Sequence, residues 1–151
     1  MYRIKEMSLN EAKEYLHWHY EKPYEFYNTP EEYYEESLKE IFSSEEKFYA
    51  VYKNDVYFGI FSFRQEDNKL ELGLGIKPEE CGKGYGEEFV LAGIKFIRET
   101  LNFPGKIWLR VKDSNERALK VYEKTHFKKV DEQLALSYGT LVNFIHLELR
   151  E

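Results

Sequence analysis

Three alternating glycines, Gly82, Gly84 and Gly86, separate two segments of different hydrophobic periodicity. The preceding segment, residues 70–76, is apolar and strand-like, whereas residues 87–101 carry apolar side chains at helical spacing. A glycine-rich turn between a strand and a helix exposes several backbone N–H groups at the positive end of that helix. The order strand, turn and helix therefore predicts a phosphate-binding site.

The spacing of these glycines limits which phosphate ligand we expect. It differs from the G-x-G-x-x-G pattern of dinucleotide-binding turns, and it lacks the Lys-Ser or Lys-Thr pair of a P-loop. No acidic residue is placed to hold the ribose of a dinucleotide. Taken alone, the run is equally compatible with a helix start whose glycines only allow close packing.

The composition restricts the class of protein. A chain of 151 residues is long enough to bury a substantial core, so we expect a single domain over residues 1–151. The net charge of −6 argues against nonspecific binding to nucleic acid and mildly favours a cationic small-molecule partner. One cysteine, no signal-peptide pattern and no apolar run of membrane-spanning length together predict a cytoplasmic protein without membrane contact.

The remaining periodicities and turn signals predict a mixed α/β order. Strands are expected over residues 2–7, 47–53, 56–64, 70–76, 106–111, 127–132 and 142–149. Helices are expected to residue 17 from a capping box at Ser8, to 42 from one at Thr29, over 87–101, and to 125 from a cap at Asp113 or Ser114. The resulting order, β-α-α-β-β-β-α-β-α-β-β, fits one central sheet.

Two blocks of the sequence together resemble the GNAT superfamily of acyl-CoA-dependent N-acyltransferases. Residues 76–86 are similar to the family's pyrophosphate motif, in which Gln or Arg, two residues, Gly, one residue and Gly or Ala follow the fourth strand. Gly84 and Gly86 occupy the glycine places, while Cys81 stands where Gln or Arg is usual. Residues 115–124 are similar to the family's Asn-x-x-Ala-x-x-x-Tyr segment. The resemblance implies a GNAT-like α/β (α+β) fold, with a mixed, mostly antiparallel central sheet of about seven strands flanked by about four helices.

The resemblance also implies acetyl-CoA as the co-substrate. The turn can bind a pyrophosphate through its backbone amides, and Asn115 and Tyr122 share a helix face about 10 Å apart along its axis. This separation suits one group holding the pantetheine arm and the other reaching the thioester sulfur. In this family the fourth strand splays from the fifth, which implies main-chain contacts from its end, with Gly75 easing a local bulge. The predicted coenzyme A-binding residues are Leu74, Gly75, Ile76, Gly82, Lys83, Gly84, Tyr85, Gly86, Glu87, Asn115 and Tyr122.

Tyr122 and Glu71 are the predicted catalytic residues. Tyr122 is expected to protonate the departing thiolate, and Glu71 to deprotonate the attacking ammonium directly, unless a chain of water does so. The alternatives are a core tyrosine and a solvated or salt-bridged carboxylate. Some relatives carry a Glu on the fifth strand where this chain has Arg110, so that role does not transfer. His146 and Glu148 on the last strand are weaker candidates for the base.

The aromatic segment after the first helix is the expected acceptor site. Residues 17–27 hold five Trp, Tyr and Phe side chains, of which Trp18, Tyr24 and Tyr27 are the predicted substrate-binding residues. The alternative is a surface loop that folds its aromatic side chains onto the core. The two histidines of this segment are two residues apart and point to different sides of a helix, so we expect no metal site.

These features predict an N-acetyltransferase that moves an acetyl group from acetyl-CoA to a primary amine by direct attack in a ternary complex. Aminoglycosides, polyamines, amino-acid derivatives and protein N-termini are all compatible acceptors, and the acidic balance favours polycationic small molecules. The competing hypothesis is a non-catalytic acyl-CoA-binding module, because Cys81, Arg110 and His126 depart from the family pattern. Many similar proteins pair as homodimers, which this sequence neither requires nor excludes. Cys81 is either a neutral replacement or, near a helix N-terminus, a thiol of lowered pKa.

Overall fold

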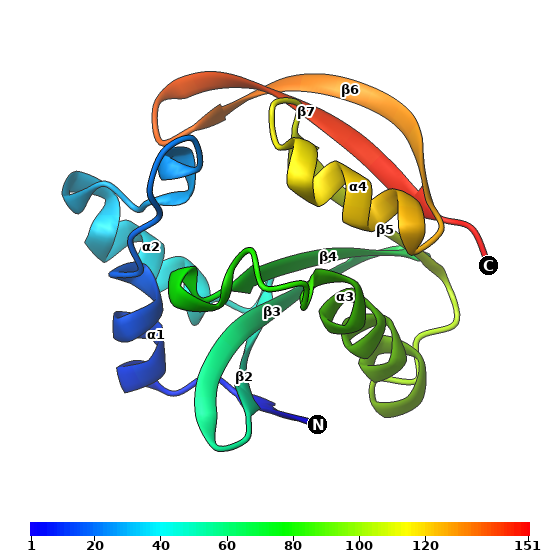
Figure 1. Cartoon of the computed structure of the whole chain (residues 1–151), viewed down its shortest axis with the longest axis horizontal. Coiled ribbons are helices and arrows are strands. Elements are labelled where there is room, and N and C mark those ends of the chain that lie inside the picture. The colour runs from blue at the N-terminus through cyan, green and yellow to red at the C-terminus, as the bar shows by residue number, and fades with distance from the viewer.

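The computed structural model describes residues 1–151 and contains one seven-stranded sheet (Figure 1). The strands are β1 (Tyr2–Glu6), β2 (Lys47–Lys53), β3 (Val56–Glu66), β4 (Lys69–Ile76), β5 (Lys106–Lys112), β6 (Phe127–Ser137) and β7 (Thr140–Leu149). They lie in the order β1-β2-β3-β4-β5-β7-β6, and every neighbouring pair is antiparallel except β4 and β5. The predicted mixed, mostly antiparallel sheet of seven strands is therefore confirmed.

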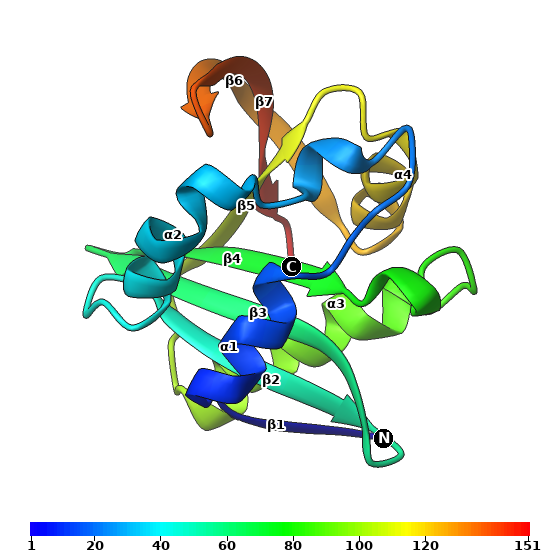
Figure 2. The same ribbon diagram turned by 90° about the vertical axis from the view of Figure 1, so that its left-hand side faces the viewer.

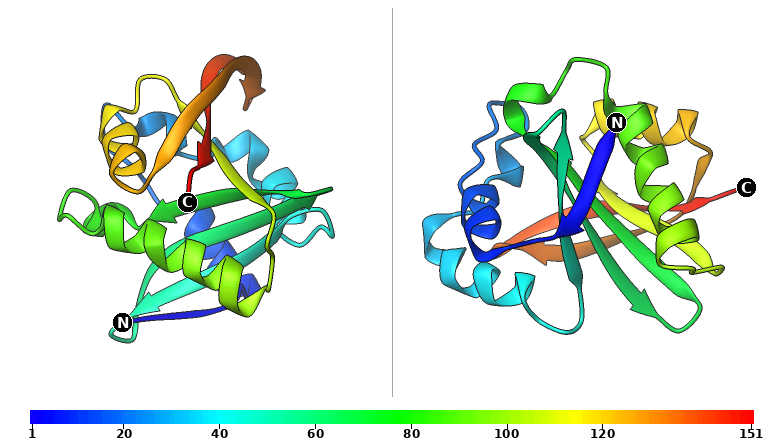
Figure 3. Two further views of the ribbon diagram at one scale, coloured as in Figure 1. Left: turned by 90° about the vertical axis from the view of Figure 1, so that its right-hand side faces the viewer. Right: turned by 90° about the horizontal axis from the view of Figure 1, so that it is seen from below.

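Four α-helices cover the sheet: α1 (Leu9–Leu16), α2 (Tyr34–Ile41), α3 (Gly86–Lys95) and α4 (Glu116–Lys124). A π-helical segment, Phe96–Thr100, continues α3, and short 3-10 helices span Glu25–Tyr27, Glu31–Tyr33 and Pro78–Glu80. α1 and α2 pack on one face of the sheet around Ala12, Leu16 and Ile41, whereas α3 packs on the other face through Phe89 and Val90 (Figure 3). None of the helices has the length and apolarity needed to cross a membrane.

The start of α1 matches the sequence, and the start of α2 does not. The Ser8 hydroxyl accepts a hydrogen bond from the Glu11 N–H, and the Glu11 carboxylate accepts one from the Ser8 N–H, which completes the predicted capping box. The capping box predicted at Thr29 is wrong. The Thr29 hydroxyl lies 3.3 Å from the Tyr138 hydroxyl of the β6–β7 hairpin, so a long-range contact replaces the local one. The chain makes a 3-10 turn here and becomes α-helical only at Tyr34.

The β6–β7 hairpin is longer than the sequence predicts. The expected strands cover residues 127–132 and 142–149, but pairing continues to Ser137 and Thr140. Tyr138 and Gly139 have φ of 49° and 79°, the left-handed backbone of a two-residue hairpin turn. The hairpin carries Tyr138 to the N-terminal end of α2, where the rings of Tyr33 and Tyr138 lie 5.2 Å apart.

β4 and β5 pair only at their N-terminal ends. Three register pairs join residues 69–71 to residues 106–108, and none follows. β4 then continues beside β3 to Ile76, while β5 continues beside β7 (Figure 1). The two strands therefore diverge toward their C-terminal ends, and the backbone of β4 beyond Glu71 has a strand partner on one side only. This splay is the one that the family resemblance implies.

Candidate functional site

The glycine turn joins β4 to α3 and borders open space. Gly82 and Gly84 have φ of 76° and 85°, a left-handed backbone that glycine adopts without strain. A Cβ on Gly84 would meet no heavy atom within 4 Å. Gly86 begins α3 and lies against α4, because a Cβ there would come within 3.0 Å of Val121 Cγ2. A helix N-terminus with open space beside it is the arrangement that favours an anion.

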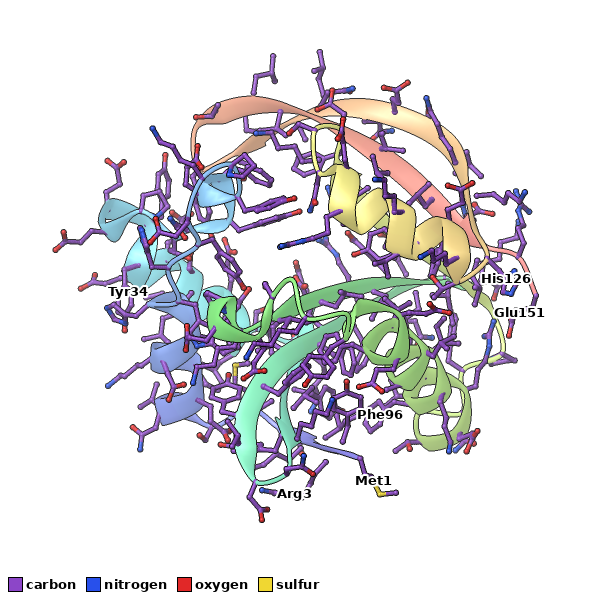
Figure 4. All side chains as sticks on the ribbon, viewed as in Figure 1. Met1, Arg3, Tyr34, Phe96, His126 and Glu151 are labelled. Carbon is purple, nitrogen blue, oxygen red and sulfur yellow. The ribbon has the colours of Figure 1, made fainter.

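A cavity of about 250 Å³ lies beside this turn. Its walls come from the end of β4, the glycine turn, α4 and the aromatic segment that follows α1, and side chains project from both sides into the central opening (Figure 4). The structure brings together most of the predicted coenzyme A-binding residues on these walls. They are Leu74, Gly75, Ile76, Gly82, Gly84, Tyr85, Gly86, Asn115 and Tyr122.

Two predicted residues of the turn and its helix do not line the cavity. The Lys83 ammonium lies 3.5 Å from the Glu80 carboxylate and is exposed. Glu87 is exposed in the first turn of α3. Neither Lys83 nor Glu87 therefore forms part of the cavity wall.

The two glycines of β4, Gly73 and Gly75, differ in how closely other atoms approach them. β3 and β4 pair without a register shift, so the bulge predicted at Gly75 is wrong. A Cβ on Gly75 would make only ordinary contact with Ile60, at 3.6 Å. A Cβ on Gly73 would instead lie 2.1 Å from Ser62 Oγ, which makes Gly73 the glycine that close strand packing requires.

Asn115 is at once the N-cap of α4 and part of the cavity wall. The cap predicted at Asp113 or Ser114 is wrong, because Asn115 Oδ1 accepts the hydrogen bond from the Ala118 N–H at 3.2 Å. The other end of the amide, Nδ2, donates a hydrogen bond to the Tyr27 hydroxyl. Asn115 is only 5% exposed, and both ends of its side-chain amide have hydrogen-bond partners within the protein, as is usual for a buried polar group.

Tyr122, on α4, lines one side of the cavity, and its ring packs into the core. It is 8% exposed, and its ring centroid lies 5.8 Å from that of Phe127. Burial raises the pKa of Tyr122 well above the usual range of a phenol. The hydroxyl is therefore protonated at neutral pH, as a proton donor to a thiolate must be.

The aromatic segment crosses from α1 to the N-terminal end of α4 (Figure 2). Tyr24 and Tyr27, two of the three predicted substrate-binding residues, line the cavity. The Tyr27 hydroxyl meets Asn115, and the Tyr24 ring lies 4.2 Å below the guanidinium carbon of Arg117. On the β5 side, the Lys112 ammonium lies 3.9 Å from the centroid of Phe26. These contacts tie the segment to the β5–β7 side of the splay.

Two further tyrosines on the cavity wall were not among the predicted residues. Tyr15 comes from the last turn of α1, and Tyr20 follows it in the aromatic segment. The Tyr20 hydroxyl donates a hydrogen bond to the Ile76 carbonyl at 2.7 Å, and burial raises its pKa. The aromatic richness of the segment was the available signal, but it does not say which rings face inward.

Trp18 lies in the core rather than on the cavity wall. It is 7% exposed, and its ring centroid lies 5.3 Å from that of Tyr15 and 5.1 Å from that of Tyr57. The structure therefore does not bring Trp18 together with Tyr24 and Tyr27, and it takes the core role that was the alternative for this segment.

Glu71 also lies away from the cavity lining. Its carboxylate accepts two hydrogen bonds from Arg110, from Nε at 2.7 Å and from a terminal nitrogen at 3.1 Å. The hydrogen bond to Glu71 raises the pKa of Arg110 further. Of the weaker candidates, Glu148 is within 4 Å of Lys69, Lys106 and Arg150 nitrogens, and the His146 ring lies 4.9 Å from that of Trp108.

Cys81 faces the turn backbone. Its thiol donates toward the Ile76 carbonyl at 3.4 Å and the Lys77 carbonyl at 3.6 Å. Burial raises the pKa of Cys81, and nearby Arg117 only partly offsets this, so the lowered pKa considered from the sequence is wrong. Arg117 lines the cavity and was not predicted, although it follows Asn115 by two residues.

No group of three or more His, Cys, Asp or Glu side chains is arranged to hold a metal ion.

Comparisons with known proteins give the family and the fold. The family model described as "Acetyltransferase (GNAT) domain" matches residues 3–128. A chimera of spermidine N-acetyltransferase SpeG from Vibrio cholerae and hSSAT is 18% identical, covers 98% of this chain and 94% of its own, and superposes with a TM-score of 0.78. SpeG from Vibrio cholerae in complex with manganese ions is also 18% identical, with coverages of 98% and 91% and a TM-score of 0.73. At such identities the structural likeness concerns the fold alone. The search of curated proteins gives no match.

Proposed function

Because this chain belongs to the GNAT acetyltransferase family, we propose that it moves an acetyl group from acetyl-CoA to a primary amine of a polycationic small molecule. The observation that carries the proposal is the cavity of about 250 Å³. It joins the glycine turn, the splayed end of β4, Asn115 and Tyr122 to a wall of tyrosines. One space thus connects the groups suited to a phosphate, a thioester and an amine.

The proposed coenzyme A site uses backbone N–H groups on both sides of the turn. Gly82 and Gly84 leave room for phosphate oxygens beside the N-terminus of α3. The Lys77 N–H donates to the Phe58 carbonyl of β3 at 2.8 Å. Since N–H direction alternates along an antiparallel strand, the N–H groups of Leu74 and Ile76 point away from β3, toward the splay. They are the proposed donors to the pantetheine arm and to the thioester oxygen.

The proposed reaction is direct attack of the neutral amine on the thioester carbonyl. The C–N bond forms, the C–S bond breaks, and the thiolate of coenzyme A leaves. Tyr122, whose hydroxyl is protonated before the step, donates that proton or a hydrogen bond to the thiolate. Much of the acceleration comes from holding both reactants in one cavity.

The ammonium of the acceptor must first lose a proton. Glu71 does not line the cavity, and its carboxylate accepts two hydrogen bonds from Arg110. We therefore favour loss of the proton to water in the cavity over direct transfer to Glu71. A direct general base contributes about 10²–10⁴-fold, so we expect Glu71→Gln to lower kcat by less than about tenfold.

Arg110→Gln is the matched control for Glu71→Gln. Both variants break the same ion pair, but Arg110→Gln leaves the carboxylate in place. If Glu71→Gln lowers kcat by about 10²-fold or more while Arg110→Gln does not, Glu71 is the base and the water route is rejected.

Two features favour a polycationic acceptor. Residues 21–46, which include the second half of the aromatic segment and all of α2, hold nine glutamates and two lysines. The cavity wall on this side carries Tyr15, Tyr20, Tyr24 and Tyr27, whose ring faces attract ammonium groups. SpeG, which shares the fold, is named a spermidine N-acetyltransferase. We propose polyamines as the acceptor class.

The test is release of free thiol from acetyl-CoA with one amine at a time. The panel is spermidine, spermine, an aminoglycoside, an amino-acid amide and a peptide with a free N-terminus. We expect the highest kcat/KM with spermidine or spermine, and mass spectrometry should find one acetyl group on the amine. Preference for the aminoglycoside or the peptide would reject the polyamine assignment. Tight binding of acetyl-CoA without turnover on any amine would favour a non-catalytic binding module.

A further inference from the structure

The glycine turn lacks a cationic side chain of its own that reaches the cavity, and the one charged residue of the β4–α3 connection on the cavity wall is Glu80, a carboxylate. The Cys81 thiol is turned back to the carbonyls of Ile76 and Lys77. Lys83 is engaged with Glu80 and lies outside the cavity wall. A pyrophosphate carries its charge on several oxygens, and glycine N–H groups supply only partial positive charge. The residues of the turn alone therefore place no positively charged side chain beside the proposed pyrophosphate.

Arg117 supplies a cation from the opposite wall. It is the only lysine or arginine that lines the cavity, and it makes no ion pair with a carboxylate. One terminal nitrogen of its guanidinium lies 3.7 Å from the place that a Cβ of Gly82 would occupy, which sets it directly beside the turn. The side chain is exposed at the cavity rim, so its hydrogen-bond donors are accessible to a ligand.

We propose that Arg117 binds the pyrophosphate of coenzyme A and replaces the side chain that position 81 does not provide. This inference rests on the proposed use of acetyl-CoA. A guanidinium donates several N–H groups from a planar fork and binds phosphate oxygens in pairs, which a thiol cannot do. The charge thus comes from α4 instead of from the turn between β4 and α3.

Tyr24 positions this guanidinium. The Arg117 guanidinium carbon lies 4.2 Å from the Tyr24 ring centroid, and stacking of this kind uses the face of the fork rather than its N–H edges. Tyr24 belongs to the aromatic segment that also forms the acceptor wall. The segment therefore contributes to cofactor binding as well as to acceptor binding.

Calorimetric titration with coenzyme A, dephospho-coenzyme A and pantetheine tests the proposal without turnover. We expect Arg117→Ala to weaken binding of coenzyme A and of dephospho-coenzyme A by a similar factor, about ten- to a hundredfold, the range for a hydrogen bond to a charged group. Binding of pantetheine, which has no pyrophosphate, should not change. Arg117→Lys should recover part of the loss, because it restores charge without the fork. Tyr24→Ala should weaken coenzyme A binding, whereas Tyr24→Phe, which keeps the ring, should not.

Lys120→Ala is the matched control, since it removes an exposed cation from the same helix away from the cavity. It should leave all three affinities unchanged, and the thermal unfolding of each variant shows that it is folded. Equal binding of coenzyme A by wild-type protein and Arg117→Ala would overturn the assignment while leaving the proposed function in place. A loss confined to coenzyme A would assign Arg117 to the 3′-phosphate and also overturn it. Wild-type protein that binds none of the three would reject the proposed function itself.

Discussion

Replacement of Asn115 by alanine should weaken both the fold and the proposed coenzyme A site, because Asn115 caps α4 and also lines the cavity. The Oδ1 atom caps α4 through the Ala118 N–H, and loss of such a cap costs about 1 kcal/mol. The Nδ2 atom donates to the Tyr27 hydroxyl, and loss of a hydrogen bond of this kind costs about 1 kcal/mol more. We therefore expect Asn115→Ala to lower the free energy of unfolding by about 2 kcal/mol, or Tm by about 4–8 °C for a domain of this size.

Asn115→Asp separates the two roles. Asp is a good N-cap and its carboxylate can accept a hydrogen bond from the Tyr27 hydroxyl, so the free energy of unfolding should stay within about 1 kcal/mol of wild type. The added negative charge lies on the wall proposed for coenzyme A, so binding of the cofactor should weaken. Urea unfolding gives the first quantity, and calorimetry with coenzyme A gives the second.

A double-mutant cycle with Tyr27→Phe measures the contact between the aromatic segment and α4. Tyr27→Phe alone should cost about 1 kcal/mol, and the double variant with Asn115→Ala should be no less stable than Asn115→Ala alone. Strict additivity of the two losses would refute the contact. Unchanged stability of Asn115→Ala would refute the assignment of Asn115 as the cap.

Three more outcomes are expected. Tyr122→Phe should bind coenzyme A normally in calorimetry and lower kcat by about 10²-fold or more; a wild-type kcat would remove Tyr122 from the mechanism. Gly73→Ala should lower the free energy of unfolding by about 1–3 kcal/mol, because its Cβ would lie 2.1 Å from Ser62 Oγ. Adding Ser62→Ala should restore most of the lost stability, and an absence of rescue would mean that the clash is not with that hydroxyl. Burial alone would raise the pKa of Glu11, but hydrogen bonds to its carboxylate lower that pKa to about 2. The contribution of Glu11 to the stability of the fold is therefore complete above the unfolded pKa of about 4.5 and is lost as pH falls toward 2. Acid unfolding of Glu11→Gln, followed by circular dichroism, should therefore depend less on pH in that window, and an equal dependence would contradict the reasoning.

The elements that sequence reasoning predicted well are those defined by nearby residues. The capping box at Ser8 and Glu11 is complete within one turn, so no distant contact decides it. The glycines of the turn and the spacing of Asn115 and Tyr122 are likewise local, and the structure brings all of them to one cavity. The cap at Thr29 failed because the hydroxyl meets Tyr138 on a distant hairpin.

The candidate site was predictable in part for the same reason. Tyr24 and Tyr27 reach the cavity and Trp18 does not, although all three belong to one aromatic segment. Glu71 is held by Arg110 of the neighbouring strand, and Arg117 lies beside a turn that is far from it in the sequence. Hydrophobic pattern and spacing carry no information about such pairings.

The sequence by itself determined the order of strands and helices, the glycine turn at the start of a helix and the helix face that carries Asn115 and Tyr122. Each of these follows from backbone geometry within a few residues. Only the tertiary structure decided which tyrosines enclose the cavity, that Glu71 lies outside it, and that Arg117 rather than position 81 brings a cation to the turn. Those outcomes depend on how the splay of β4 and β5 sets α4 and the aromatic segment against the glycine turn, and that is settled by packing between distant segments.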